Sequence, residues 1–245
     1  MNLPWREDFK IRTFDVDFNN TVKLSSIFNF MQESASNNAE QLKFGYDDLI
    51  KNGLFWVLSR AKIQILKYLT LGDEIIIETW PKGTDKLFAL RDFRIYNSGN
   101  EIIGEATTAW LLVDNKTMRP VKPDYLVGNI PQHNIEPAII ETPGKIAETE
   151  TKAEVAEKNI GYTDIDINQH VNNVRYVDFV LDSFRMDQFK EKQISTMQIN
   201  FLSESKYEDK VKIFKGAIGN TANDYYVEGV NQNSAKVFQA HVEWV

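Results

Sequence analysis

The chain has 245 residues, of which 42% are hydrophobic and 12% aromatic, so it holds enough apolar material to bury a core and is not disordered. Its net charge of −7 and its lack of a polybasic run argue against a broad nucleic-acid-binding surface. The absence of cysteine excludes disulfides, cysteine-ligated metals and a cysteine nucleophile. No apolar run reaches the ~18 residues of a membrane span, and no signal peptide is recognised, so we expect a soluble cytoplasmic protein.

The first half of the sequence predicts one long helix followed by four strands. Apolar residues recur at steps of three and four from Leu24 to Leu42, which is typical of a helix with one buried face, and Gly45 can stop it. Alternating and β-branched runs predict strands at residues 61–66, 74–80, 87–96 and 101–113. Residues 97–100, Asn-Ser-Gly-Asn, predict a hairpin turn between the last two strands.

A proline-rich segment follows. Prolines at positions 120, 123, 131, 137 and 143 oppose both a helix interior and a central strand. We therefore expect residues 129–151 to be a linker between an N-terminal repeat, residues 1–128, and a C-terminal repeat, residues 152–245.

The second half repeats the order of the first. A helical pattern covers residues 172–184, and strand patterns cover residues 197–202, 210–218, 224–230 and 235–245. The repeat is also visible in individual residues. Residues 15–22 align with 164–171 at an offset of 149 positions, 73–75 with 209–211 at 136, and Ala106 and Trp110 with Ala240 and Trp244 at 134.

This duplication predicts a two-lobed α+β protein, in which each long helix packs on an antiparallel sheet of four or more strands. Each lobe alone would leave unpaired strands at the sheet edges. We expect the two sheets to join edge to edge, because joining removes that liability.

The two copies differ at one chemically important position. The second copy carries Asp166, Asn168 and His170, whereas the first has Thr21 where the second has the histidine. An extended segment would place the three side chains on one face, and the helix that follows offers unpaired N–H groups to a developing oxyanion. The alternative is structural, because Asp and Asn before a helix are common caps and turn formers.

Glu204 is the second candidate, since a carboxylate at the end of a strand can orient an imidazole or activate water. Its counterpart in the first copy is Tyr68, and an exposed strand-end glutamate is the alternative interpretation. His133 and His241 are weaker candidates.

The sequence has no phosphate loop, no zinc-ligand spacing and no nucleophile elbow, so we expect neither a cofactor nor a catalytic metal.

The stretch Tyr162–Tyr176, which includes Asp-x-Asn-x-His-Val-Asn-Asn, closely resembles the active-site segment of acyl-acyl carrier protein thioesterases. Segments of the first half are similar to other landmarks of that family: Trp56–Arg60, Gly72-Asp73, Glu78–Trp80, Arg91–Phe93, Thr107–Trp110 and Thr117–Pro120. The resemblance runs from about Phe9 to Val245.

The resemblance implies a tandem (double) hot-dog fold. It also implies hydrolysis of the thioester of a fatty acyl chain on acyl carrier protein, which releases free fatty acid and ends chain elongation in fatty acid biosynthesis. Asp166, Asn168, His170 and Glu204 match positions implicated in catalysis. Plant members have a cysteine at the position of Ser205, so a papain-like mechanism cannot operate here.

Two alternatives remain at this point. An acyl-CoA thioesterase or a dehydratase of the same fold would act on a different substrate, and a non-catalytic acyl-binding protein would perform no chemistry. The first half of the chain is nearly neutral and the second half carries most of the negative charge. We therefore expect the acidic carrier protein to dock on basic residues of the first half, with Lys116, Arg119 and Lys122 among the candidates. The sequence leaves open whether the chain pairs into a homodimer.

Overall fold

The computed structural model describes residues 4–123, 135–219 and 223–245. The chain divides into two compact units, Met1–Pro143 and Gly144–Val245. This division falls inside the segment that we expected as the linker, of which residues 129–134, including His133, lie outside the described residues. None of the described helices is long and apolar enough to cross a membrane.

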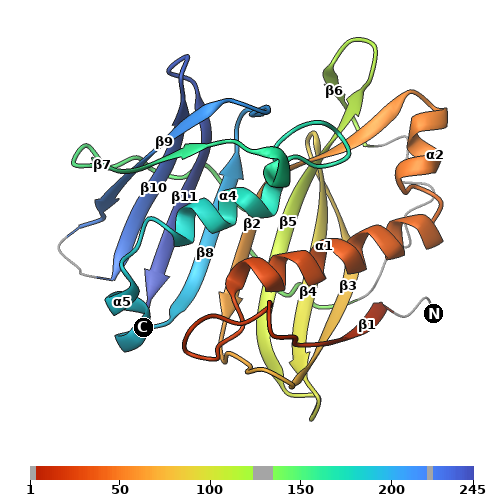
Figure 1. The fold of residues 1–245 in the computed structure, drawn as a ribbon. Helices are drawn as coiled ribbons and strands as arrows, with labels where there is room; N and C mark the ends of the chain where they lie inside the picture. Colours follow the sequence, from red (N-terminus) through yellow and green to blue (C-terminus); the bar gives the residue numbers. More distant parts are fainter. Residues whose placement is uncertain (1–3, 124–134, 220–222) are drawn as a thin grey trace. The chain divides into compact units, whose positions relative to one another are not determined.

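In the first unit, strands lie in the order β1-β3-β4-β5-β2, with antiparallel neighbours and with β6 paired to β5. The helix α1 crosses one face of this sheet (Figure 1). The described elements of this unit are β1 (Trp5–Lys10), α1 (Leu24–Gln41), α2 (Tyr46–Lys51), β2 (Leu54–Ile65), β3 (Glu74–Asp85), β4 (Phe88–Asn97), β5 (Ile102–Asp114) and β6 (Arg119–Val121).

The predicted first helix is confirmed, because its apolar positions form one buried face over the sheet. Burying each large apolar side chain contributes roughly 1.5–3 kcal/mol. The helix ends earlier than Gly45: Lys43 adopts the left-handed conformation with φ 62°, and the Phe44 N–H donates to the Ala39 carbonyl at 3.1 Å. The predicted hairpin turn is also present, closed by the Asn97 N–H on the Glu101 carbonyl at 3.1 Å.

The second unit repeats this architecture, with strands in the order β8-β11-β10-β9-β7. Its helix α4 packs on the sheet through the Tyr176 ring, which lies against Phe201 and Phe238. The described elements of this unit are β7 (Ala153–Asn159), the short 3₁₀ helix η1 (Tyr162–Asp164), α4 (Asn173–Leu181), α5 (Met186–Glu191), β8 (Ile194–Phe201), β9 (Lys210–Ala217), β10 (Asp224–Asn231) and β11 (Lys236–Trp244).

The helix of the second unit is shorter than its pattern predicts. It ends at Leu181, where the Ser183 hydroxyl donates to the Val180 carbonyl at 2.6 Å and competes with the helical bonds. Phe184 still continues the apolar pattern, because its ring packs edge-on against Tyr225 and Trp244. The apolar pattern over residues 172–184 therefore extends past the end of the helix, because Phe184 is buried without being helical.

The described part of the segment between the repeats, residues 135–151, lies on the sheet face opposite the helix in each unit. In the first unit, the Ala138 N–H donates to the buried Asp92 carboxylate at 2.9 Å. In the second unit, the Gly144 carbonyl accepts from the Gln198 side chain at 2.8 Å. Lys152 reaches the buried Glu228 carboxylate at 2.8 Å. Residues 135–151 lack regular structure but are anchored by polar bonds to the sheet of each unit.

Candidate active site

The residues before α4 form a tight turn. The Asp166 N–H donates to the His170 carbonyl at 2.9 Å, the Gln169 N–H donates to the Asp166 carbonyl at 3.0 Å, and Ile165 forms an isolated bridge with Val171. Gln169 takes a left-handed φ of 65°. Our expectation of an extended segment is therefore wrong.

The Asp166 carboxylate explains this turn. Its Oδ1 atom accepts the Asn168 N–H at 2.8 Å, which is the geometry of an Asx turn. The Asn168 side-chain amide is 3.5 Å from Oδ2 of the same carboxylate. Asp166 is half-buried and Asn168 is exposed, so the pair is accessible from solvent.

His170 and Glu204 are in direct contact. His170 Nε2 is 3.0 Å from Glu204 Oε2, and their side chains are 28% and 50% exposed. The Val171 N–H donates to the Ser205 carbonyl at 2.9 Å, so the backbone itself holds the two loops together. A carboxylate on Nε2 orients the ring and favours the tautomer with its proton on that nitrogen. Among the described residues, no hydrogen bond or ion pair joins the Asp166 carboxylate to this imidazole.

One of the free N–H groups at the start of α4 is already bound by the capping residue of the helix. The Asn172 side chain accepts the Val174 N–H at 2.9 Å, which satisfies one of the N–H groups that we expected to face an oxyanion. Arg175 in the first turn pairs with the buried Asp164 at 2.8 Å. Sequence reasoning did not single out this cap or this ion pair. The signal for the cap was present, because Asn172 stands immediately before the first helical residue.

The corresponding turn of the first unit has the same backbone but different side chains. The Asp17 N–H donates to the Thr21 carbonyl at 2.8 Å, and Asn20 has a φ of 62°, 149 positions before Gln169. The Asp17 carboxylate accepts the N–H groups of Asn19 and Thr21, so its interactions are those of a turn former. Tyr68 stands at the position of Glu204, and burial raises its pKa, so it carries no charge at neutral pH.

Ser205 lies beside Glu204 but is buried, with no exposed surface. Its hydroxyl is a neighbour of the Tyr176 hydroxyl, and among the described residues neither group makes a hydrogen bond of ordinary geometry. Burial raises the pKa of Tyr176 to about 12, so this phenol is not a base at neutral pH. Among the described contacts, none brings a base to the serine hydroxyl.

The remaining histidines lie elsewhere. His133 is outside the described residues. His241 is in β11, where its Nδ1 atom is 3.8 Å from a Glu243 carboxylate oxygen, and it makes no bond with the turn before α4 among the described contacts.

Two family models match the sequence. Residues 2–127 match the acyl-ACP thioesterase N-terminal domain, and residues 147–245 match the acyl-ACP thioesterase C-terminal domain.

Individual proteins are similar along most of the chain. An oleoyl-acyl carrier protein thioesterase from Coriandrum sativum is 29% identical over 226 residues, which cover 85% of this chain and 61% of the coriander protein. A palmitoyl-acyl carrier protein thioesterase from Arabidopsis thaliana is 26% identical over 99% of this chain and 64% of its own length. The chain thus spans less than two thirds of the length of these relatives, which are described as chloroplastic.

Two solved structures resemble this chain over nearly their full length. The structure of an acyl-ACP thioesterase from Bacteroides thetaiotaomicron has a TM-score of 0.88 and 27% identity, and the match covers 98% of this chain and 97% of that one. A 12:0-ACP thioesterase from Umbellularia californica has a TM-score of 0.83 at 22% identity, covers 100% of this chain and 98% of that one, and supports the fold alone.

Proposed function

Because the chain belongs to the acyl-acyl carrier protein thioesterase family, we propose that it hydrolyses the thioester between a fatty acyl chain and acyl carrier protein. The products are free fatty acid and the carrier thiol, so the reaction ends chain elongation in fatty acid biosynthesis. The double hot-dog fold that the resemblance implies is confirmed by the match to the Bacteroides structure along nearly the whole chain.

The observation that carries this proposal is the contact between His170 and Glu204 at 3.0 Å, beside the half-buried Asp166. The first unit keeps the same turn but has a threonine and a tyrosine at these two positions. A binding protein would need only the scaffold. Placement of an imidazole and two carboxylates together in one copy favours an enzyme with its catalytic residues in the C-terminal repeat, residues 152–245.

The proposed reaction adds water across the carbon–sulfur bond. A thioester carbonyl is electrophilic and its thiolate leaves readily, so the protein must supply an activated nucleophile and stabilise the oxyanion. Asp166 acts either as the general base for water or as the nucleophile itself, and Asn168 positions the carbonyl with N–H groups at the start of α4. His170, oriented by Glu204, assists proton transfer, and the departing sulfur leaves as a thiol.

The proposed partner is acyl carrier protein, a soluble carrier. We propose a cytoplasmic location, which is supported by the absence of cysteine, since a chain with no disulfides gains nothing from an oxidising compartment. A homodimer is not required by the scheme, because the four candidate residues lie in one unit of one chain.

The test compares substrates side by side. Purified protein is given the same acyl chain on acyl carrier protein and on coenzyme A, and thiol release is followed for each. We expect a higher kcat/KM with acyl carrier protein. Faster hydrolysis of acyl-CoA would identify the alternative thioesterase, and acyl binding without thiol release would identify a non-catalytic binding protein.

A further inference from the structure

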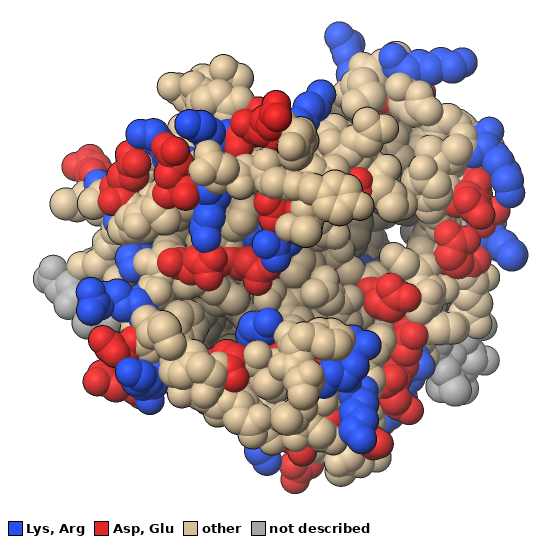
Figure 2. All heavy atoms as spheres, in the orientation of Figure 1, with Lys and Arg blue, Asp and Glu red and all other residues tan. Residues whose placement is uncertain are grey.

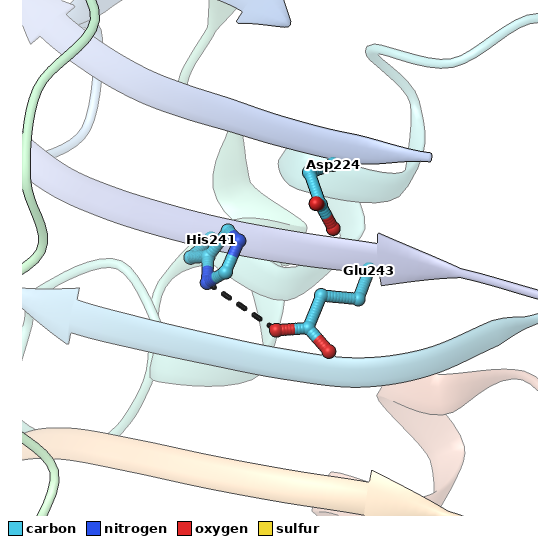
Figure 3. A group of neighbouring side chains, drawn as sticks. All are labelled: Asp224, His241 and Glu243. Carbon is cyan, nitrogen blue, oxygen red and sulfur yellow. Dashed lines mark ion pairs between the residues drawn. The ribbon is translucent and has the colours of Figure 1, made fainter. Parts of the chain in front are cut away.

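A second group of titratable side chains lies in the sheet of the second unit. His241 and Glu243 are two residues apart in β11, so their side chains leave the same face of the strand. Asp224, at the start of β10, pairs directly with Glu243 and shares that face. Figure 3 shows the three side chains directed toward one another.

The separation of the ligand atoms suits a metal ion. One atom from each residue lies within 4.8 Å of the other two, and His241 Nδ1 is 3.8 Å from Glu243 Oε1. Bonds of about 2.0–2.2 Å to zinc place neighbouring ligands of a tetrahedron roughly 3.4 Å apart. A bound ion would have to draw the three atoms together by rotation of their side chains. Because the three residues are half-buried, solvent can supply a fourth ligand.

The charges of the group also favour a cation. Asp224 and Glu243 are like charges in a direct cross-strand pair, an arrangement that destabilises an antiparallel sheet. The cross-strand neighbours of His241, which are Gln198 and Tyr226, add no further negative charge to this repulsion. A bound divalent ion would offset it directly.

We propose that Asp224, His241 and Glu243 form a binding site for a divalent transition-metal ion. Zn²⁺ suits this set, because it accepts imidazole nitrogen together with carboxylate oxygen. Mg²⁺ does not, because it prefers oxygen ligands in a near-ideal octahedron.

The site is remote from the candidate catalytic residues of the same unit. In the β8–β11 pair, Phe238 lies opposite Phe201, near the strand end that leads to Glu204, whereas Glu243 lies opposite Thr196. Five residues of strand span roughly 16 Å. A metal ion at this site therefore joins the start of β10 to the end of β11 and plays no part in thioester cleavage.

Isothermal titration of chelator-treated protein at neutral pH tests the proposal, with Zn²⁺ and Mg²⁺ as separate probes. We expect one equivalent of Zn²⁺ to bind and Mg²⁺ to bind far more weakly. His241→Ala should abolish the site, and Asp224→Asn or Glu243→Gln should each weaken it by about tenfold or more. His170→Ala, which removes the other described histidine, should bind Zn²⁺ like the unmodified protein.

A thermal melt provides a second readout. Zn²⁺ should raise the Tm of the unmodified protein and of His170→Ala, but not that of His241→Ala. The proposal is overturned if no binding occurs at about 0.1 mM Zn²⁺. It is also overturned if His241→Ala retains the affinity of the unmodified protein, if His170→Ala loses it, or if Mg²⁺ binds as tightly as Zn²⁺.

Discussion

The His170 imidazole and the Asp166 carboxylate are oriented by different partners. The ring is held by the Glu204 side chain at 3.0 Å, whereas the carboxylate is held by the Asn168 N–H at 2.8 Å. The two bonds share no atom, although the Asp166 carboxylate also forms the turn that carries His170. His170→Ala should therefore remove the imidazole while leaving the turn and its carboxylate in place.

Asp166→Ala and His170→Ala should each lower kcat by about 10²-fold or more, the usual scale for acid–base groups, because the nucleophile or its proton relay is lost. Thioester hydrolysis with acyl carrier protein as the substrate carrier gives the rates. Thr21→Ala, at the matching position of the first unit, is the control and should be nearly silent. An active Asp166→Ala variant would contradict the proposed mechanism.

Ser205→Ala should retain most activity, although Ser205 lies next to the candidate residue Glu204. A serine hydroxyl is a weak nucleophile without a base, and this one is buried beside the Tyr176 phenol, which is not a base at neutral pH. The kcat of the variant measures its contribution, and a circular dichroism spectrum shows whether the variant is folded. A folded but inactive Ser205→Ala variant would support a serine nucleophile instead.

The sequence predicts the candidate side chains better than it predicts their backbone. It names Asp166, Asn168, His170 and Glu204, and the structure has the contact between His170 and Glu204; the catalytic roles stay predictions. The extended conformation was wrong because spacing alone does not show that a carboxylate will bind the N–H two residues ahead.

At the scale of whole elements, the connecting segment depends on one glycine in β9. A Cβ atom at Gly216 would collide with the carbonyl oxygen of Thr151 and crowd the Thr149 side chain. Gly216→Ala should therefore push the segment off the sheet and lower the free energy of unfolding by about 1–3 kcal/mol, the usual cost of overpacking.

Gly144→Ala is the matched control, because no atom outside its chain neighbours lies within 4 Å of a Cβ there and its backbone is not left-handed. Urea denaturation of the two variants gives the comparison. Equal stabilities would show that the segment is not held against β9 at this point.

The strands that sequence patterns missed are the short β6 and the first strand of each unit. β1 and β7 pair with β3 and β9, and both precede the long helix of their unit. Their outward residues are largely charged, and β7 contains few large apolar residues, so the alternation was too weak to predict a strand. Such strands form because β3 and β9 offer them an unpaired edge, and a pattern within residues 5–10 or 153–159 does not show that edge.

At the scale of the whole molecule, charge is distributed unevenly. The basic residues Lys116, Arg119 and Lys122 are exposed at the β5–β6 hairpin, and Figure 2 shows Lys and Arg side chains projecting where β6 lies. Reversing the three charges to Glu should raise KM for the acylated carrier about fivefold at low salt, equivalent to ~1 kcal/mol, and leave kcat unchanged.

The same reversal of Lys10, Lys43 and Lys51, which are also exposed in the first unit, is the control. Steady-state kinetics at two salt concentrations separate the outcomes, because a charge-based effect weakens as salt screens it. An unchanged KM for the hairpin variant would place the docking surface elsewhere.

The fold class was predictable from the whole sequence because the same order of one helix and several strands occurs in it twice. The offset of 149 positions that relates residues 15–22 to 164–171 also relates the bridges Val16–Val22 and Ile165–Val171. The extra strand in each repeat was not predictable from such matches, because residues 5–10 and 154–159 share little sequence.

The left-handed residue in each turn has an energetic consequence. An ordinary L-residue pays roughly 1–2 kcal/mol for this conformation, and asparagine tolerates it better than most. The first turn has Asn20 at this position and the second has Gln169, so the turn that bears the histidine is the more strained of the two. Gln169→Asn should stabilise the protein, and Asn20→Gln should destabilise it, each by about 0.5–1 kcal/mol in urea unfolding. Opposite signs would place the greater strain in the first turn. The expected signs would mean that, of these two matching turns, the one that bears the histidine is the less stable.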